Sequence, residues 1–341
     1  MYRKDAIVVG EWIRNSNKAL LVTGARQTGK TWLIRDEIEK SGYTKFELNF
    51  IDQPDMVSYL NAEMSAEEFL IKLKMIMPED CKSHETVVFF DEIQKCPEIV
   101  TKIKFLVDEG SFKYVMSGSL LGVELKGIAS APVGYLTVLK MYPMDFEEFM
   151  MANNVSVTTL DMLNEKFKNA SPVDEFVHQK LLSMFFVYLI VGGMPDAVKT
   201  YIETKDIREV DKVQRDITTL YKEDFSQYEI EDRKLKLKSI YDIIPAELNK
   251  QNKKFVFTML DKELKFDRYE NSFLWLKDAG VALPVYNIEA PVIPLLASKS
   301  SNIFRLFSSD IGLLTSAYPA ETKMELINKN GEVNNGAHFE N

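Results

Sequence analysis

The chain has few of the residues that build disulfide frameworks or metal centres. Its 341 residues include two cysteines, Cys81 and Cys96, which are too few for the disulfide scaffold of a small secreted protein. The three histidines are scattered without the spacing of metal ligands. This composition argues against a disulfide or metal framework, and it fits the reducing conditions of the cytoplasm.

The sequence also lacks a long apolar run and an excess of positive charge. Its most apolar stretch, LLSMFFVYLIVGGMP, is too short to cross a bilayer, and we expect a buried helix there. The N-terminus, MYRKDAIVVGEW, lacks the apolar core and cleavage site of a signal peptide. The formal net charge of −9 provides no overall attraction for nucleic acid. We therefore expect a cytoplasmic protein without membrane contact.

The most informative motif lies at residues 24–31, which read GARQTGKT and match G-x-x-x-x-G-K-[S/T]. An apolar run, ALLVT, precedes this motif and an amphipathic stretch, TWLIRDEIEK, follows it, so the order is strand, loop and helix. Glycines let successive backbone N–H groups point into one concavity, and the helix N-terminus adds positive charge. The pattern predicts a site for the triphosphate of a nucleotide, formed by Gly24, Ala25, Arg26, Gln27, Thr28, Gly29, Lys30, Thr31 and Trp32.

Four side chains in and after this motif have predicted chemical roles. Lys30 is suited to neutralise the β- and γ-phosphates, and the hydroxyl of Thr31 is suited to hold Mg²⁺. The apolar run TVVFF predicts a buried parallel strand that ends in Asp91 and Glu92. Asp91 is suited to hold Mg²⁺ through water, and Glu92 to orient and polarise the attacking water. The alternative is that both carboxylates are solvated and cap the next helix.

A third predicted strand, FKYVMSGS, places small hydroxyls near the same edge of the sheet. Ser117 and Ser119 are candidates to contact the γ-phosphate or the water, although Ser-Gly-Ser is also ordinary turn chemistry. Arg26 has three possible partners, which are a phosphate, a neighbouring subunit, or a carboxylate such as Glu92.

The pattern of strand and helix signals divides the chain. Alternating signals predict a P-loop parallel α/β sheet with strands at residues 19–23, 45–50, 86–90, 112–117 and 135–140. Helical periodicity follows, and helices with a short hairpin then suggest a winged helix. The expected domains are a P-loop ATPase α/β domain, a helical lid, a winged-helix domain and a polar tail, at residues 1–150, 151–230, 231–325 and 326–341.

Seven blocks of the sequence together resemble a family of predicted prokaryotic AAA-superfamily P-loop ATPases. In order, they are ALLVTGARQTGKTWLI, ELNFIDQP, VVFFDEIQKCPE, MSGSLLG, MYPMDFEEF, VGGMPDAV and FRLFSSDIGLL. Members of that family have a C-terminal region of unknown function, with a winged helix and a nuclease-like domain. The resemblance implies binding of ATP with Mg²⁺ and hydrolysis of its phosphoric anhydride bond. It also implies a lid in which Pro195 packs on adenine, although a plain break between two helices is the alternative.

The chain departs from this family at two places. It stops at Gly336–Asn341, where relatives begin the nuclease-like domain, so we expect that activity to be absent and Glu340 to be at most an orphan member of such a site. Tyr135 stands where many relatives have a basic residue after the glycine. If that position supplies charge to a phosphate across a subunit contact, this chain lacks it there, and turnover is expected to be slower.

Two hypotheses for the function follow. In the first, the protein is an ATP-hydrolysing AAA-type switch that binds ATP and ADP and acts on an unknown protein target or through self-association. In the second, it is a nucleotide-dependent DNA-binding or regulatory module with little turnover. The basic segments Arg233–Lys238 and Asn249–Phe255 could contact phosphates. DNA is the less favoured partner because acidic residues are interleaved among these lysines.

Overall fold

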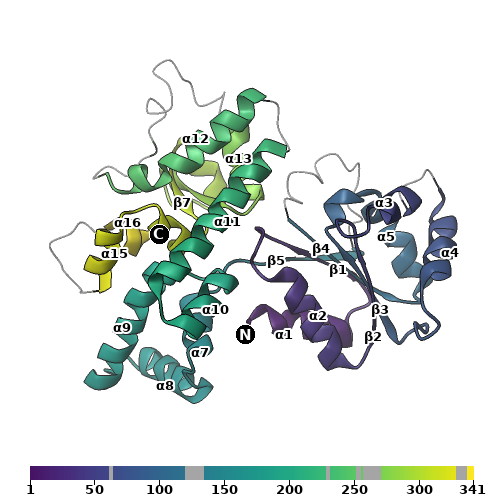
Figure 1. The fold of residues 1–341 in the computed structure, drawn as a ribbon, viewed down its shortest axis with the longest axis horizontal. Helices are drawn as coiled ribbons and strands as arrows, with labels where there is room; N and C mark the ends of the chain where they lie inside the picture. Colours follow the sequence, from purple (N-terminus) through teal and green to yellow (C-terminus); the bar gives the residue numbers. More distant parts are fainter. Residues whose placement is uncertain (61–63, 120–133, 228–230, 251–254, 256–269, 328–335) are drawn as a thin grey trace. The chain divides into compact units, whose positions relative to one another are not determined.

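A computed structural model describes residues 1–60, 64–119, 134–227, 231–250, 255, 270–327 and 336–341 (Figure 1). The chain divides into two compact units. The first comprises residues 3–142, and the second comprises residues 143–341 together with the first two residues. Among the described residues, no helix combines the length and the apolar composition needed to cross a membrane.

The first unit is built on a five-stranded parallel sheet with the strand order β2-β3-β4-β1-β5. The five predicted strands are all present, which confirms the predicted α/β fold with a parallel sheet. Their bounds are β1 Ala19–Thr23, β2 Thr44–Asn49, β3 Thr86–Asp91, β4 Lys113–Gly118 and β5 Leu136–Lys140. Because all neighbours are parallel, the carboxyl ends of the strands lie along one edge of the sheet.

Helices cover both faces of this sheet, and β3 contributes to both hydrophobic clusters. Every residue of β3 is buried, as its continuous apolar run predicts. Val87 and Phe89 join the cluster under two helices, α1 Asp5–Asn15 and α2 Lys30–Ser41. Val88 and Phe90 point to the opposite face, because side chains alternate along a strand. That face is covered by α3 Pro54–Leu60, α4 Ala66–Ile76 and α5 Glu98–Glu109.

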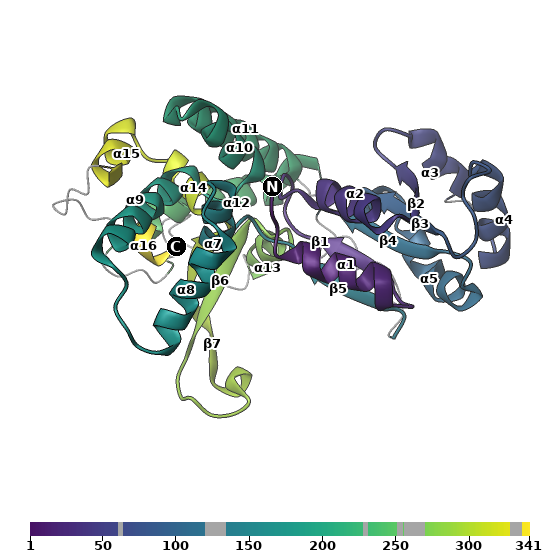
Figure 2. The ribbon, with the colours of Figure 1, turned by 90° about the horizontal axis from the view of Figure 1, so that it is seen from below.

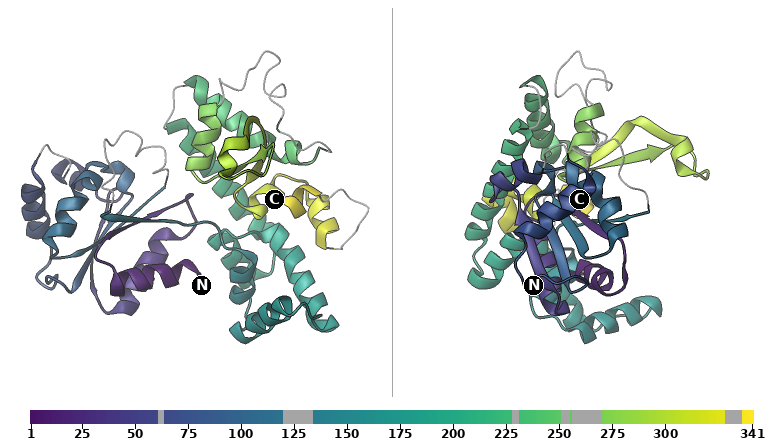
Figure 3. Two further views of the ribbon diagram at one scale, coloured as in Figure 1. Left: turned by 180° about the vertical axis from the view of Figure 1, so that it is seen from behind. Right: turned by 90° about the vertical axis from the view of Figure 1, so that its right-hand side faces the viewer.

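The second unit is mainly helical, and its described residues include one antiparallel hairpin, which projects from the helices (Figures 2 and 3). The hairpin pairs β6 Ala282–Ile288 with β7 Lys299–Ser308. The winged-helix assignment stays a prediction, because a hairpin beside helices is not by itself diagnostic of that fold. The helices are α7 Phe146–Ala152, α8 Val157–Lys168, α9 Glu175–Val191, α10 Pro195–Thr204, α11 Ile207–Gln227, α12 Glu231–Leu248, α13 Glu270–Asp278, α14 Ile311–Ser316, α15 Ala320–Ile327 and α16 Gly336–Glu340.

The Gly-Gly-Met-Pro segment between α9 and α10 packs against the start of α14. The buried carboxylate of Asp310 accepts hydrogen bonds from the backbone N–H of Gly193 at 2.6 Å and of Leu313 at 2.9 Å. A Cβ atom on Gly192 would lie 2.3 Å from the Asp310 side chain, and one on Gly193 would lie 1.9 Å from the carbonyl oxygen of Met144. Both glycines are therefore required by close packing within this unit.

We expect Asp310→Ala to lower the free energy of unfolding by about 2–4 kcal/mol, because it removes the N-cap of α14 and leaves the N–H of Gly193 buried without an acceptor. Denaturation of the full chain with urea, followed by circular dichroism, measures this change. Asp310→Asn is the matched control, since it keeps one acceptor oxygen and should lose less. Equal stability of Asp310→Ala and the unchanged chain would contradict the assignment.

The same carboxyl group should make stability depend on pH. Burial raises the pKa of Asp310 from 3.8 to about 6, so the folded chain binds this proton more tightly than the unfolded chain. Its contribution to stability is therefore complete below pH 3.8 and is lost as the pH rises to about 6. Urea midpoints measured across this range should show a larger change in the unchanged chain than in Asp310→Ala, in which the remaining carboxyl groups still titrate.

Candidate functional site

The loop after β1 has a backbone that glycine makes possible. Gly24 has φ 143° and Gly29 has φ 90°. A Cβ atom on Gly24 would lie 2.1 Å from the carbonyl oxygen of Met141, so no other residue fits there. Inside the loop, the hydroxyl of Thr28 donates to the carbonyl oxygen of Ala25 at 3.0 Å. The glycines at both ends of the motif thus set the path of the loop.

Lys30, the first residue of α2, folds its ammonium group back onto this loop. Its Nζ donates to the carbonyl oxygens of Ala25 at 2.7 Å and of Gly24 at 3.1 Å. Burial lowers the pKa of Lys30 from 10.5 to about 8, while the charges of Glu92 and Asp91 act in the opposite direction. A cation is therefore held at the loop before any anion binds.

Arg3 supports the loop from outside the motif. Its side chain is only 4% exposed, and it donates to the carbonyl oxygen of Thr28 at 2.9 Å and to that of Tyr142 at 2.6 Å. The guanidinium group thereby connects the loop to the last residue of the first unit. No sequence motif pointed to Arg3, since its partners lie 25 and 139 residues away.

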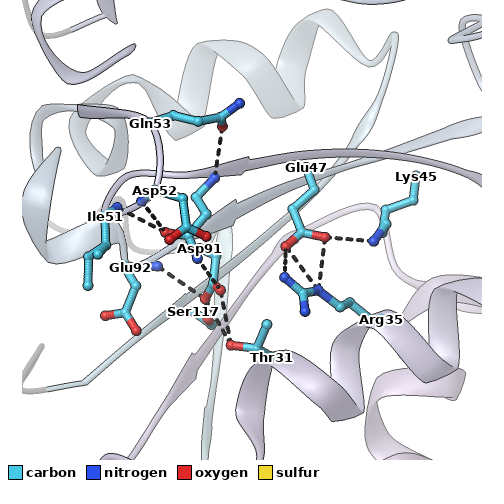
Figure 4. Close-up of polar contacts among 11 residues, drawn as sticks. Thr31, Arg35, Lys45, Glu47, Ile51, Asp52, Gln53, Asp91, Glu92 and Ser117 are labelled. Atoms are coloured by element: carbon cyan, nitrogen blue, oxygen red, sulfur yellow. Dashed lines mark hydrogen bonds and ion pairs between the residues drawn. The ribbon is translucent and has the colours of Figure 1, made fainter. Parts of the chain in front are cut away.

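Asp91 gathers polar groups from three elements and from the residue after β3, at the carboxyl edge of the sheet (Figure 4). Its carboxylate accepts from the hydroxyl of Thr31 at 3.0 Å, the amide of Asn49 at 3.2 Å and the backbone N–H of Glu92 at 3.1 Å. The hydroxyl of Ser117 donates to the same carboxylate. Burial raises the pKa of Asp91, and the hydrogen bonds from Ser117 and Thr31 oppose that shift.

Glu92 lies beside Asp91 with its backbone in the left-handed region, at φ 55° and ψ 45°. The side-chain amide of Gln94, in the 3₁₀ turn η1 Ile93–Lys95, donates to the Glu92 carboxylate. The same amide donates to the hydroxyl of Ser119 at 3.4 Å, and Arg26 Nε donates to that hydroxyl at 3.3 Å. A chain of hydrogen bonds through Gln94 and Ser119 thus connects Glu92 to Arg26.

A pair of charged contacts anchors α2 beside this edge. Arg35 Nε donates to both carboxylate oxygens of Glu47 at 3.0 Å, and Lys45 lies 2.6 Å from the same carboxylate (Figure 4). Because Glu47 lies on β2, this cluster connects the helix that carries Lys30 and Thr31 to the sheet.

The sequence-predicted residues of the first unit gather at this edge of the sheet. Two of them have exposed side chains, Gln27 in the loop and Trp32 on α2, the latter 47% exposed. Pro195 lies in the second unit, so its contact with adenine remains a prediction. Three contributors were missed, namely Arg3, Asn49 and Gln94. The position of Asn49 at the carboxyl end of a neighbouring predicted strand was a usable signal.

Two family models match the chain. Residues 16–150 match an AAA domain, and residues 183–324 match a domain of unknown function. An uncharacterized protein of Methanocaldococcus jannaschii is 26% identical over 194 residues, which cover 57% of this chain and 38% of that protein. The matched stretch thus spans well under two thirds of that relative's length.

Solved structures add a likeness of fold. A Walker-type ATPase of Pyrococcus abyssi is 13% identical, with a TM-score of 0.53 over 92% of this chain and 95% of that chain. AMPPCP-bound DnaA from Aquifex aeolicus is 12% identical, with a TM-score of 0.37 over 82% and 89%. Only the first likeness is close enough to indicate a shared fold. The chain therefore shares the fold of this Walker-type ATPase, and its match to an AAA domain model over residues 16–150 precedes its match to a domain of unknown function.

Proposed function

We propose that this protein binds ATP with Mg²⁺ at the loop of residues 24–31 and hydrolyses it to ADP and phosphate. The observation that carries the proposal is the contact between the Thr31 hydroxyl and the Asp91 carboxylate, at 3.0 Å, next to the buried cation of Lys30. This contact joins the two parts of the sequence that were assigned to one metal-nucleotide site. It lies in a domain that matches the AAA family model.

The donor set fits both parts of such a ligand. A hydroxyl and a carboxylate oxygen are hard ligands of the kind that Mg²⁺ prefers, and they come from Thr31 and Asp91. Bound Mg²⁺ would neutralise negative charge on phosphate oxygens. We expect the ammonium of Lys30 to exchange the loop carbonyls for phosphate oxygens, because these carry full negative charge.

In the proposed reaction, Glu92 orients a water molecule toward the γ-phosphorus. A bond forms from the water oxygen to this phosphorus, the bond from the phosphorus to the β,γ-bridging oxygen breaks, and a proton is released to solvent. Ser119, whose hydroxyl accepts a hydrogen bond from Arg26 Nε at 3.3 Å, is our candidate to sense the γ-phosphate together with Arg26. Ser117 has a different task, because its hydroxyl donates to Asp91 and thereby orients the metal ligand.

Hydrolysis would drive a switch in which the second unit responds to the nucleotide. The target is a protein or a second copy of this chain. Duplex DNA is the less favoured partner because of the net charge of −9. Steady-state phosphate release by the full chain, measured with and without duplex DNA, tests hydrolysis against the alternative of a module with little turnover.

We expect Lys30→Ala to weaken ATP–Mg²⁺ binding by about 100-fold or more, because the lost ammonium makes charge-assisted hydrogen bonds to phosphate. Isothermal titration gives the affinity, and far-UV circular dichroism reports the fold. Lys40→Ala, which changes an exposed lysine in the last turn of the same helix, is the matched control and should bind normally. In the unchanged chain, affinity should fall as the pH rises above about 8, where Lys30 loses its proton. A folded Lys30→Ala chain with unchanged affinity would refute the phosphate site.

We expect Glu92→Gln to retain ATP binding and to lose hydrolysis by about 100-fold or more, because the change is nearly isosteric and removes the charge that orients water. Asp91 and Thr31 still serve the metal in this variant. Turnover and affinity are measured on the same preparation. If turnover stays within about threefold, Glu92 does not orient the water.

A further inference from the structure

One glutamine side chain connects the ends of two strands at the candidate site. Gln94 is 6% exposed, and its Nε2 donates both to the Glu92 carboxylate and, at 3.4 Å, to the Ser119 hydroxyl. Glu92 follows the last residue of β3, and Ser119 follows the last residue of β4. A single amide group therefore holds two side chains that the proposed reaction uses.

The chemistry of the carboxylate determines how this amide is turned. An ionised carboxylate only accepts hydrogen bonds, so the N–H side of the Gln94 amide must face Glu92. The Gln94 carbonyl oxygen is then buried, and it has no hydrogen-bond partner among the described residues. An unpartnered buried carbonyl destabilises a fold. Packing alone would thus favour an apolar side chain here, which indicates that the amide serves another purpose.

The backbone of Glu92 supports the same conclusion. It is in the left-handed region, which is unfavourable for a residue other than glycine and is concentrated at functional sites. In this conformation the side chain places Oε2 on the Gln94 amide. Within the part of the chain that the structure describes, Oε1 of Glu92 accepts no hydrogen bond.

We propose that Gln94 is a positioning residue for Glu92 in ATP hydrolysis, a role that presupposes the proposed function of the site. Its Nε2 holds Oε2 of the carboxylate and leaves Oε1 to accept a hydrogen bond from the attacking water. Its second hydrogen bond, to Ser119, ties the direction of the carboxylate to a residue placed near the γ-phosphate. The reacting atoms are contacted by Glu92, and Gln94 acts through it.

Gln94→Met in the full chain tests this role, because methionine has a similar volume and no amide. We expect kcat to fall by about 10- to 100-fold, as for other groups that orient a catalytic side chain. The dissociation constant for a non-hydrolysable ATP analogue with Mg²⁺ should stay within about twofold. The urea midpoint should be unchanged or higher, because the unpartnered carbonyl is removed. If Gln94 served only to stabilise the fold, its replacement would instead lower the urea midpoint and weaken binding of the ATP analogue.

Gln179→Met is the matched control. Gln179 is exposed on α9 and donates to the carboxylate of Glu175 at 2.8 Å, so it offers the same kind of contact away from the site. This variant should keep its kcat. In a chain that already carries Glu92→Gln, adding Gln94→Met should lower single-turnover hydrolysis no further, since there is no carboxylate left to position.

The outcomes separate this role from the proposed function. If the unchanged chain has no turnover, the proposed hydrolysis fails and the role of Gln94 fails with it. If the unchanged chain hydrolyses ATP and Glu92→Gln does so equally well, hydrolysis stands, but Glu92 does not orient the water and the role of Gln94 is overturned. If Glu92→Gln loses hydrolysis while Gln94→Met keeps kcat within about twofold, only the role of Gln94 is overturned. A fall in the urea midpoint or in analogue affinity that accounts for the lost turnover overturns it as well.

Discussion

The buried carboxylate of Asp91 is the constraint on which the rest of the site depends. A carboxylate in the interior needs hydrogen-bond donors, because water no longer solvates it. Donors reach it from α2, β2, β4 and the residue after β3, through Thr31, Asn49, Ser117 and the N–H of Glu92. The carboxylate that would bind the metal ion therefore also holds α2, β2 and β4 in position around the end of β3.

Two buried cations hold the loop in the same way. Lys30 and Arg3 both donate to backbone carbonyls of the loop, one from its own helix and one from the start of the chain. These contacts satisfy the charges and fix the loop before a phosphate binds. Preorganisation of this kind lowers the ordering cost of binding.

Close packing determines the structure around the two glycines of the second unit, whereas buried charged groups organise the candidate site of the first unit. Gly192 and Gly193 meet Asp310 and the start of α14, although more than 110 residues separate them. Two of the sequence blocks that suggested the family, VGGMPDAV and FRLFSSDIGLL, thus pack against each other, because the end of α9 contacts the start of α14. Glycine is required at both positions because neighbouring atoms occupy the space that a Cβ atom would need. This requirement holds whether or not Pro195 also contacts a nucleotide.

The sequence by itself determined the local features of this protein. The strand, loop and helix around residues 24–31 and the buried strand ending in Asp91 could be read directly, because each arises from neighbouring residues, and the parallel sheet followed from their alternation. Tertiary structure alone decided the partners: Arg3 on the loop, Asn49 on Asp91, and Asp310 on Gly193. Gln94 is near Glu92 in sequence, yet its second contact with Ser119 depends on how β3 and β4 pair. Such contacts join residues far apart in the chain, and a single sequence carries periodicity and local geometry but no record of which distant side chains meet.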